Sequence, residues 1–124
     1  MNPFYKYLTK EDHLHRAILV YCEFQYPNCF LHHSPNEGKR SKFERFKAKY
    51  LGMDKGFPDL IWLDPNKGYN GLALEVKVIY DNGAKNKPSK YQIDKIDKLE
   101  NRNWFVKVIW TFDEAKKIID WYFN

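Results

Sequence analysis

The chain has 124 residues, a length that fits one domain and is too short for two separate hydrophobic cores. Hydrophobic residues make up 44% and charged residues 30% of the sequence, which excludes an intrinsically disordered protein. The formal net charge of +5 favours a polyanionic partner, although many basic proteins bind no nucleic acid.

Cysteine usage and hydropathy indicate the cellular setting. Cys22 and Cys29 are too few for a disulfide framework, so we expect a reducing cytosol. The first ten residues lack a long apolar stretch, and no run of about 18 apolar residues occurs, so neither a signal peptide nor a membrane span is expected. The P-loop pattern is absent, which argues against a nucleotide cofactor. We expect a single domain over residues 1–124, in the cytoplasm.

The first predicted element is a helix that begins after Thr9. Thr9 and Asp12 have the spacing of an N-terminal cap, and Glu11 lies in the first turn, where the helix dipole favours a carboxylate. Apolar residues recur at helical spacing as far as Cys22. We expect this helix to end before Pro27.

An extended segment, a loop and a short helix are predicted next. Residues 30–40 are expected to run extended and then loop, because turn-forming residues gather from Ser34 onward. Residues 41–51 are strongly basic and predict a short helix. Its aromatic residues stand at helical spacing: Phe43, Phe46 and Tyr50. Gly52 and Gly56 then bracket a tight connection.

Two strands follow, separated by a turn. Residues 59–63 predict a short buried strand, and residues 64–68 predict a turn. Residues 71–79 alternate more clearly than any other segment, which predicts a strand with one apolar face. The opposite face presents Glu75 and Lys77 side by side.

The last third of the chain predicts a loop, a helix, a strand and a final helix. Residues 81–90 are polar, basic and rich in turn formers, and we expect a mobile loop. Ser89 and Gln92 form a capping pattern for a helix that carries Ile93, Ile96 and Leu99. Residues 104–110 predict a third strand. Thr111 with Glu114 predicts the start of a last amphipathic helix, with Ala115, Ile118, Ile119 and Tyr122 on one face. The order of elements indicates a small α/β sandwich with a mixed sheet.

We expect the catalytic site where the strands predicted at residues 59–63 and 71–79 meet. If these strands pair, Asp59 and Glu75 converge at one edge, and the ammonium group of Lys77 lies on the same face as Glu75. Hard cations such as Mg²⁺ prefer oxygen ligands of this kind, and a lysine can orient a water or stabilise negative charge. The alternative is a solvated sheet face with a cross-strand ion pair.

The residues at these positions resemble known nuclease motifs. Gly56-Phe57-Pro58-Asp59-Leu60, followed by Glu75-Val76-Lys77, resembles the GxPD…ExK core of PD-(D/E)xK nucleases. The stretch from His33 to Arg40, and Ser89 with Gln92, are similar to the virus-type replication-repair nuclease (VRR-NUC) family. The resemblance extends from Glu11 to Ile119 and implies a restriction-endonuclease-like α/β fold, a small mixed sheet flanked by helices.

The resemblance also implies roles for individual residues. Asp59, Glu75 and the Val76 carbonyl would ligate Mg²⁺ or Mn²⁺, Lys77 would be the catalytic lysine, and Gln92 would lie beside the site.

The first helix would contribute one further acid, Glu11. The family usually has a glutamine shortly after this acid, and His15 stands in the comparable place. Glu11 therefore has an alternative role as a favourable first-turn residue alone.

Two groups of polar residues are candidate DNA contacts. Asn36, Lys39 and Arg40 are expected to line the phosphate path, and Lys85, Lys87, Ser89 and Lys90 to meet the backbone. The alternative for both groups is a capping asparagine and solvated cations.

Zinc and histidine chemistry are less favoured. A zinc site on Cys22, Cys29, His32 and His33 fits no common spacing. Nothing in the sequence places His13 or His15 near the carboxylates, so neither is expected to be a catalytic base.

Three functions therefore compete. The first is a metal-dependent DNA endonuclease that selects branched DNA such as a Holliday junction and acts as a homodimer in viral or prophage DNA processing, within a bacterial host. The second is a nuclease of little selectivity, or a nickase. The third is a DNA-binding module that keeps the fold and does not cut.

Overall fold

A mixed four-stranded sheet forms the centre of the computed structural model, which describes residues 2–34 and 41–124. The strands lie in chain order: β1 (Leu31–His33), β2 (Leu60–Trp62), β3 (Leu72–Val76) and β4 (Phe105–Ile109). β1 with β2 and β2 with β3 pair antiparallel, whereas β3 and β4 pair parallel. The parallel pair requires a crossover, which runs through a helix.

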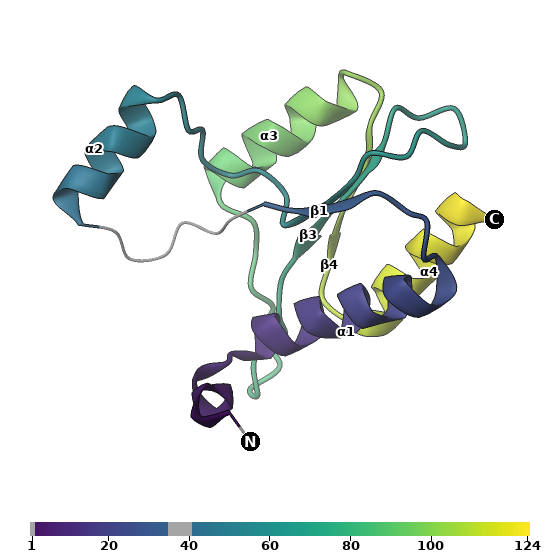
Figure 1. Cartoon of the computed structure of the whole chain (residues 1–124), viewed down its shortest axis with the longest axis horizontal. Helices are drawn as coiled ribbons and strands as arrows, with labels where there is room; N and C mark the ends of the chain where they lie inside the picture. The colour runs from purple at the N-terminus through teal and green to yellow at the C-terminus, as the bar shows by residue number, and fades with distance from the viewer. Residues whose placement is uncertain (1, 35–40) are drawn as a thin grey trace.

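Four α-helices and one 3₁₀-helix surround this sheet in the described residues. They are η1 (Pro3–Tyr7), α1 (Lys10–Gln25), α2 (Lys42–Tyr50), α3 (Lys90–Glu100) and α4 (Phe112–Phe123). Figure 1 shows α1 and α4 on one side of the sheet and α3 on the other, with α2 at the far end of the molecule. The predicted α/β sandwich with a small mixed sheet is confirmed.

Local sequence sets the helix starts. The side chains of Thr9, Ser41, Ser89 and Thr111 each accept a hydrogen bond from the amide three residues later. These caps satisfy amides that have no partner inside the helix. α1 ends at Gln25, before Pro27, as the sequence predicts.

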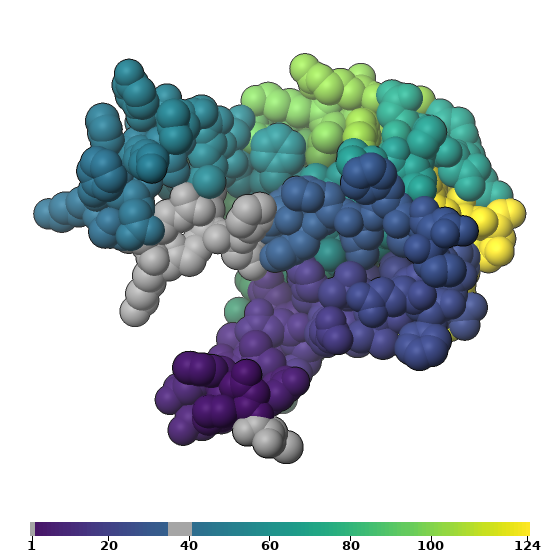
Figure 2. All heavy atoms as spheres, viewed as in Figure 1, coloured from purple at the N-terminus to yellow at the C-terminus, as the bar shows by residue number. Residues whose placement is uncertain are grey.

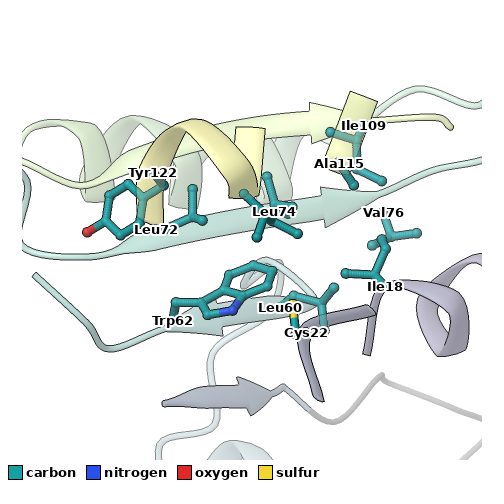
Figure 3. Close-up of a cluster of buried hydrophobic side chains, with 11 residues drawn as sticks. Ile18, Cys22, Leu60, Trp62, Leu72, Leu74, Val76, Ile109, Ala115 and Tyr122 are labelled. Carbon is teal, nitrogen blue, oxygen red and sulfur yellow. The ribbon is translucent and has the colours of Figure 1, made fainter. Parts of the chain in front are cut away.

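The hydrophobic core fills the space between the sheet and the α1–α4 pair (Figure 3). Ile18 and Cys22 of α1 pack with Ala115, Ile119 and Tyr122 of α4. The strands contribute Leu60, Trp62, Leu72, Leu74, Val76 and Ile109. The apolar face predicted for β3 is therefore the one that α1 and α4 cover.

The opposite face of β3 is buried as well. Glu75 is 1% exposed and Lys77 is 8% exposed. The alternative of a solvated sheet face is therefore wrong. A buried carboxylate and ammonium need an explanation beyond solubility, because removing charges from water is costly.

The segment predicted to be a mobile loop has its own hydrogen bonds. Ile79 forms an isolated antiparallel bridge with Lys85, and Asn86 donates its amide to the Val78 carbonyl. The indole of Trp110 donates to the Asn86 carbonyl at 2.6 Å. Residues 79–86 therefore form a turned-back hairpin against β4, which the turn-rich composition did not reveal.

α2 buries no residue, and Figure 1 shows it standing away from the sheet. In the described part of the chain, no helix has the length and apolar character needed to cross a membrane.

Candidate active site

Strand pairing brings the two predicted acids together. The antiparallel register sets Leu60 opposite Leu74, so the chain continues with Asp59 opposite Glu75. Asp59 is buried, and its Oδ2 accepts a hydrogen bond from the Val76 amide at 2.9 Å. A carboxylate held by a main-chain amide has a fixed position, and this contact ties Asp59 to the end of β3.

Glu75 is held on one oxygen and free on the other. Its Oε1 accepts a hydrogen bond from Gln92 Nε2 at 3.0 Å and lies 3.6 Å from the Lys77 ammonium. Its Oε2 is buried and has no hydrogen-bond partner among the described residues. Burial, followed by the negative charge of Asp59, raises the pKa of Glu75 from its ordinary value of 4.5 to about 9.

These features fit a divalent cation. A buried oxygen beside a second carboxylate is costly unless a cation binds it or a proton is shared between the two acids, and the raised pKa of Glu75 shows that the metal-free site favours the shared proton. The described residues contain no group of three or more His, Cys, Asp or Glu side chains arranged to hold one metal ion. Two carboxylates with main-chain oxygen and water match the ligand set that Mg²⁺ accepts, since this ion usually keeps several waters.

Glu11 lies close enough for its charge to act on the site. It is half-buried at the start of α1, and burial followed by the charge of Asp59 raises its pKa, while Lys77 lowers it. Glu11 also contributes to the raised pKa of Glu75. The structure thus brings this residue to the edge where Asp59, Glu75 and Lys77 meet, and its role as a ligand stays a prediction.

Two histidines adjoin this edge, and neither has a role in the site predicted from the sequence. The rings of His15 and His33 make an edge-to-face contact with centroids 4.3 Å apart, and His33 Nδ1 lies 3.2 Å from the Asp59 carbonyl oxygen. Burial lowers the pKa of His15, His33 adds to this, and Asp59 acts in the opposite direction. The structure thus places His15 within reach of the charge of Asp59, which periodicity alone did not predict. The pairing of β1 with β2 brings His33 beside Asp59, and His15 reaches His33 from α1. His13 is exposed.

The connection that carries Asp59 is packed against the start of α3. Gly56 has φ +89°, and a Cβ there would lie 2.5 Å from the Tyr91 carbonyl carbon and oxygen. Lys95 of α3 is buried, pairs with Asp54 at 3.3 Å and lies over the Phe57 ring. These contacts fix the segment that ends at Asp59 relative to the helix that carries Gln92.

The remaining predicted positions are dispersed. Asn36, Lys39 and Arg40 lie outside the described residues. Lys85 lies over the Trp110 ring at 4.8 Å, Lys90 lies over Tyr91 at 5.3 Å, and Lys87 is exposed. The Ser89 hydroxyl caps α3 by accepting from the Gln92 amide at 3.3 Å. These residues follow the active-site strand, but the structure does not gather them into one cluster.

The zinc alternative finds no support. Cys22 is buried in the core, where burial raises its pKa to about 12, away from the thiolate that zinc requires. Among the described residues, Cys22, Cys29, His32 and His33 do not form a group of three or more side chains that could hold a metal ion.

Comparison with known families assigns the chain. The VRR-NUC domain matches residues 6–111. The chain belongs to the VRR-NUC domain family. VRR-NUC is a nuclease domain, and the matched range contains the site residues Asp59, Glu75, Lys77 and Gln92.

Solved structures share the VRR-NUC fold. One, named "VRR_NUC domain protein", superposes with a TM-score of 0.76 at 23% identity, over 93% of this chain and 88% of that chain. A second, named "VRR_NUC domain", gives a TM-score of 0.58 at 22% identity, over 91% of this chain and 97% of that chain. No curated protein matches the sequence. The restriction-endonuclease-like fold expected from the sequence is thus confirmed.

Proposed function

We propose that this protein is a metal-dependent DNA endonuclease that hydrolyses phosphodiester bonds. One observation carries the proposal: Asp59 and Glu75 are buried side by side, and Glu75 Oε2 has no hydrogen-bond donor among the described residues unless a proton is shared with Asp59. Two acids held this way in a nuclease-family fold have a clear use, which is to bind a hard cation next to a phosphate.

Each site residue has a role in this proposal. Asp59, Glu75 and the Val76 carbonyl would hold Mg²⁺ or Mn²⁺, and Glu11, which forms no three-acid group with them in the described residues, would contribute through water. When bound, the cation polarises the phosphate and lowers the pKa of a water molecule. The Val76 amide and Gln92 orient the two carboxylates through the hydrogen bonds already described.

Lys77 acts on the attacking water and on the developing charge. Its side chain is 10% exposed and reaches to 3.6 Å from Glu75 Oε1. A nearly buried ammonium interacts strongly with charge, because little water screens it. The lysine therefore orients the water and stabilises negative charge on the phosphate as the bond breaks.

The substrate and assembly are proposed as well. The net charge of +5 favours a polyanion, and Lys85, Lys87 and Lys90 follow β3 along the chain. We propose branched DNA, such as a four-way junction, cut by a homodimer that presents two active sites in a bacterial cytoplasm during viral or prophage DNA processing. Residues 1–124 form one nuclease domain in this proposal.

Cleavage of plasmid, duplex and four-way-junction DNA with Mg²⁺, Mn²⁺ and EDTA tests the proposal. We expect cutting with either metal, none with EDTA, and none in the Asp59→Asn or Lys77→Gln variants, while circular dichroism stays unchanged. Cleavage in EDTA would refute the mechanism. DNA binding without cleavage under every metal would favour the non-cleaving module instead. Equal rates on all substrates would favour the non-selective nuclease, and light scattering that shows a monomer at micromolar concentration would remove the homodimer.

A further inference from the structure

α2 carries an aromatic face that packs against nothing in the core. We define this face as Phe43, Phe46 and Tyr50, whose exposed fractions are 63–78%. The rings of Phe46 and Tyr50 lie nearly parallel, with an interplanar angle of 21° and centroids 5.8 Å apart. A short helix gains most of its stability by packing an apolar face, so this one is expected to meet a partner.

Cations border this face on both sides. At 100° per residue, Lys42 and Lys49 fall beside Phe46 along one edge of the aromatic face and Lys47 falls beside Phe43 along the other, while Arg45 lies further round the helix. α2 has a single acid, Glu44, whose side chain accepts a hydrogen bond from the Ser41 amide in the capping box. The helix therefore offers flat aromatic surface framed by positive charge.

The position of α2 connects it to the active site. Its C-terminal end leads through residues 51–58 into Asp59, along the segment that Gly56 and Phe57 pack against α3. Figure 2 shows α2 as a lobe that projects from the main body, well apart from the α1–α4 side. A ligand bound to α2 is therefore linked through residues 51–58 to Asp59, the carboxylate proposed to bind the metal.

We propose that the aromatic face of α2 binds unpaired bases of the DNA substrate by stacking, while the bordering cations contact the sugar–phosphate backbone. The choice of DNA rests on the proposed function, and the inference narrows the branched substrate to one with a single-stranded segment near the cleaved bond, which a fully paired four-way junction lacks. Aromatic rings beside cations suit such a segment, because every base has a flat face and every nucleotide a negative charge. Paired bases in a duplex do not offer those faces.

A second copy of the chain fits this surface less well. Three rings that each bury about 150–250 Å² when fully covered supply at most about 450–750 Å². This is below the roughly 800 Å² per partner of a standard interface. A symmetric pairing would also oppose two helices that each carry four cations and one acid.

Fluorescence anisotropy with labelled single-stranded and blunt duplex DNA, in EDTA, tests the inference. We expect Phe46→Ala with Tyr50→Ala to weaken single-strand binding by roughly 5- to 100-fold for each stacked base. Duplex binding should change less than threefold. Alanine has a high helix propensity, so the helix is retained. Tyr50→Phe keeps the ring and should bind like the original chain.

Phe24→Ala is the matched control, since Phe24 is 81% exposed on α1, outside this face. It should leave both affinities unchanged. Equal losses on single-stranded and duplex DNA, or no loss on either, would overturn the inference. One further result would overturn the inference: the original chain is a dimer, and the Phe46→Ala with Tyr50→Ala variant is a monomer that binds DNA as before. The aromatic face would then join two copies of the chain.

The binding readout separates this inference from the proposed function. If the original chain cuts DNA and the double variant binds normally, the stacking surface is refuted and the nuclease stands. If α2 binds single strands as described and no metal supports cleavage of any DNA, the nuclease is refuted and the stacking surface stands.

Discussion

Gly56→Ala is expected to destabilise the protein and to disturb the active site together. Gly56 has φ +89°, and the added Cβ would lie 2.5 Å from the Tyr91 carbonyl carbon and oxygen and 2.8 Å from the Gln92 amide nitrogen. All three are main-chain atoms of α3, so none of them can rotate away from the added Cβ. The connection before Asp59 and the start of α3 must move apart.

Gly52→Ala provides the matched control. Gly52 has φ +85°, and its added Cβ would have no atom within 4 Å. Both variants bear the left-handed backbone cost of about 1–2 kcal/mol. Gly56→Ala alone adds an overpacking cost of about 1–3 kcal/mol, so it should lose that much more unfolding free energy than Gly52→Ala.

Urea unfolding followed by circular dichroism measures the two free energies. Cleavage assays should show a larger loss of kcat in Gly56→Ala, because Asp59 lies three residues along and Gln92 holds Glu75. Equal destabilisation in both variants would refute the argument, since it would mean that the contact with α3 contributes nothing.

Further predictions concern single interactions. Gln92→Ala should reduce cleavage roughly 10- to 100-fold at limiting Mg²⁺, with partial recovery at high Mg²⁺, because Glu75 loses its orienting partner. Because the pKa of Glu75 is raised from 4.5 to about 9, the folded state favours the protonated acid. Metal-free unfolding free energy should therefore fall as pH rises from 4.5 to 9, and Glu75→Gln should flatten that slope in urea titrations. Glu11→Gln should raise the Mg²⁺ concentration for half-maximal cleavage, and full activity at all Mg²⁺ concentrations would remove Glu11 from the site. Tyr122→Phe should cost about 1–3 kcal/mol in thermal unfolding, because its hydroxyl donates to the Asp64 carbonyl and accepts from the Asn66 amide.

The buried acids connect stability with activity. Asp59 and Glu75 lie where the sheet would pack better with neutral side chains, since each is almost fully buried near a like charge. A cation that binds the folded state and not the unfolded chain offsets this cost. We therefore expect Mg²⁺ to raise the melting temperature of the original chain more than that of the Glu75→Gln variant.

The sequence alone determined the features that depend on neighbours along the chain. Three helix starts follow from capping residues spaced three apart, at Thr9, Ser89 and Thr111, and the buried faces of β3 and α4 follow from alternation and helical spacing. The resemblance to a nuclease motif predicts Asp59, Glu75 and Lys77 as site residues, and the antiparallel pairing of β2 with β3 explains why Asp59 and Glu75 come together.

Only the tertiary structure decided the contacts between distant segments. The edge-to-face pair of His15 and His33 depends on α1 lying beside β1, and the hairpin at residues 79–86 is tied to the end of β4 by the Trp110 indole. The unpartnered Oε2 of Glu75 appears only once α3 covers the sheet, since burial and not residue type makes that oxygen costly. The periodicity of the sequence shows which side of a helix or strand is apolar. The packing of distant segments decides which residues each side contacts.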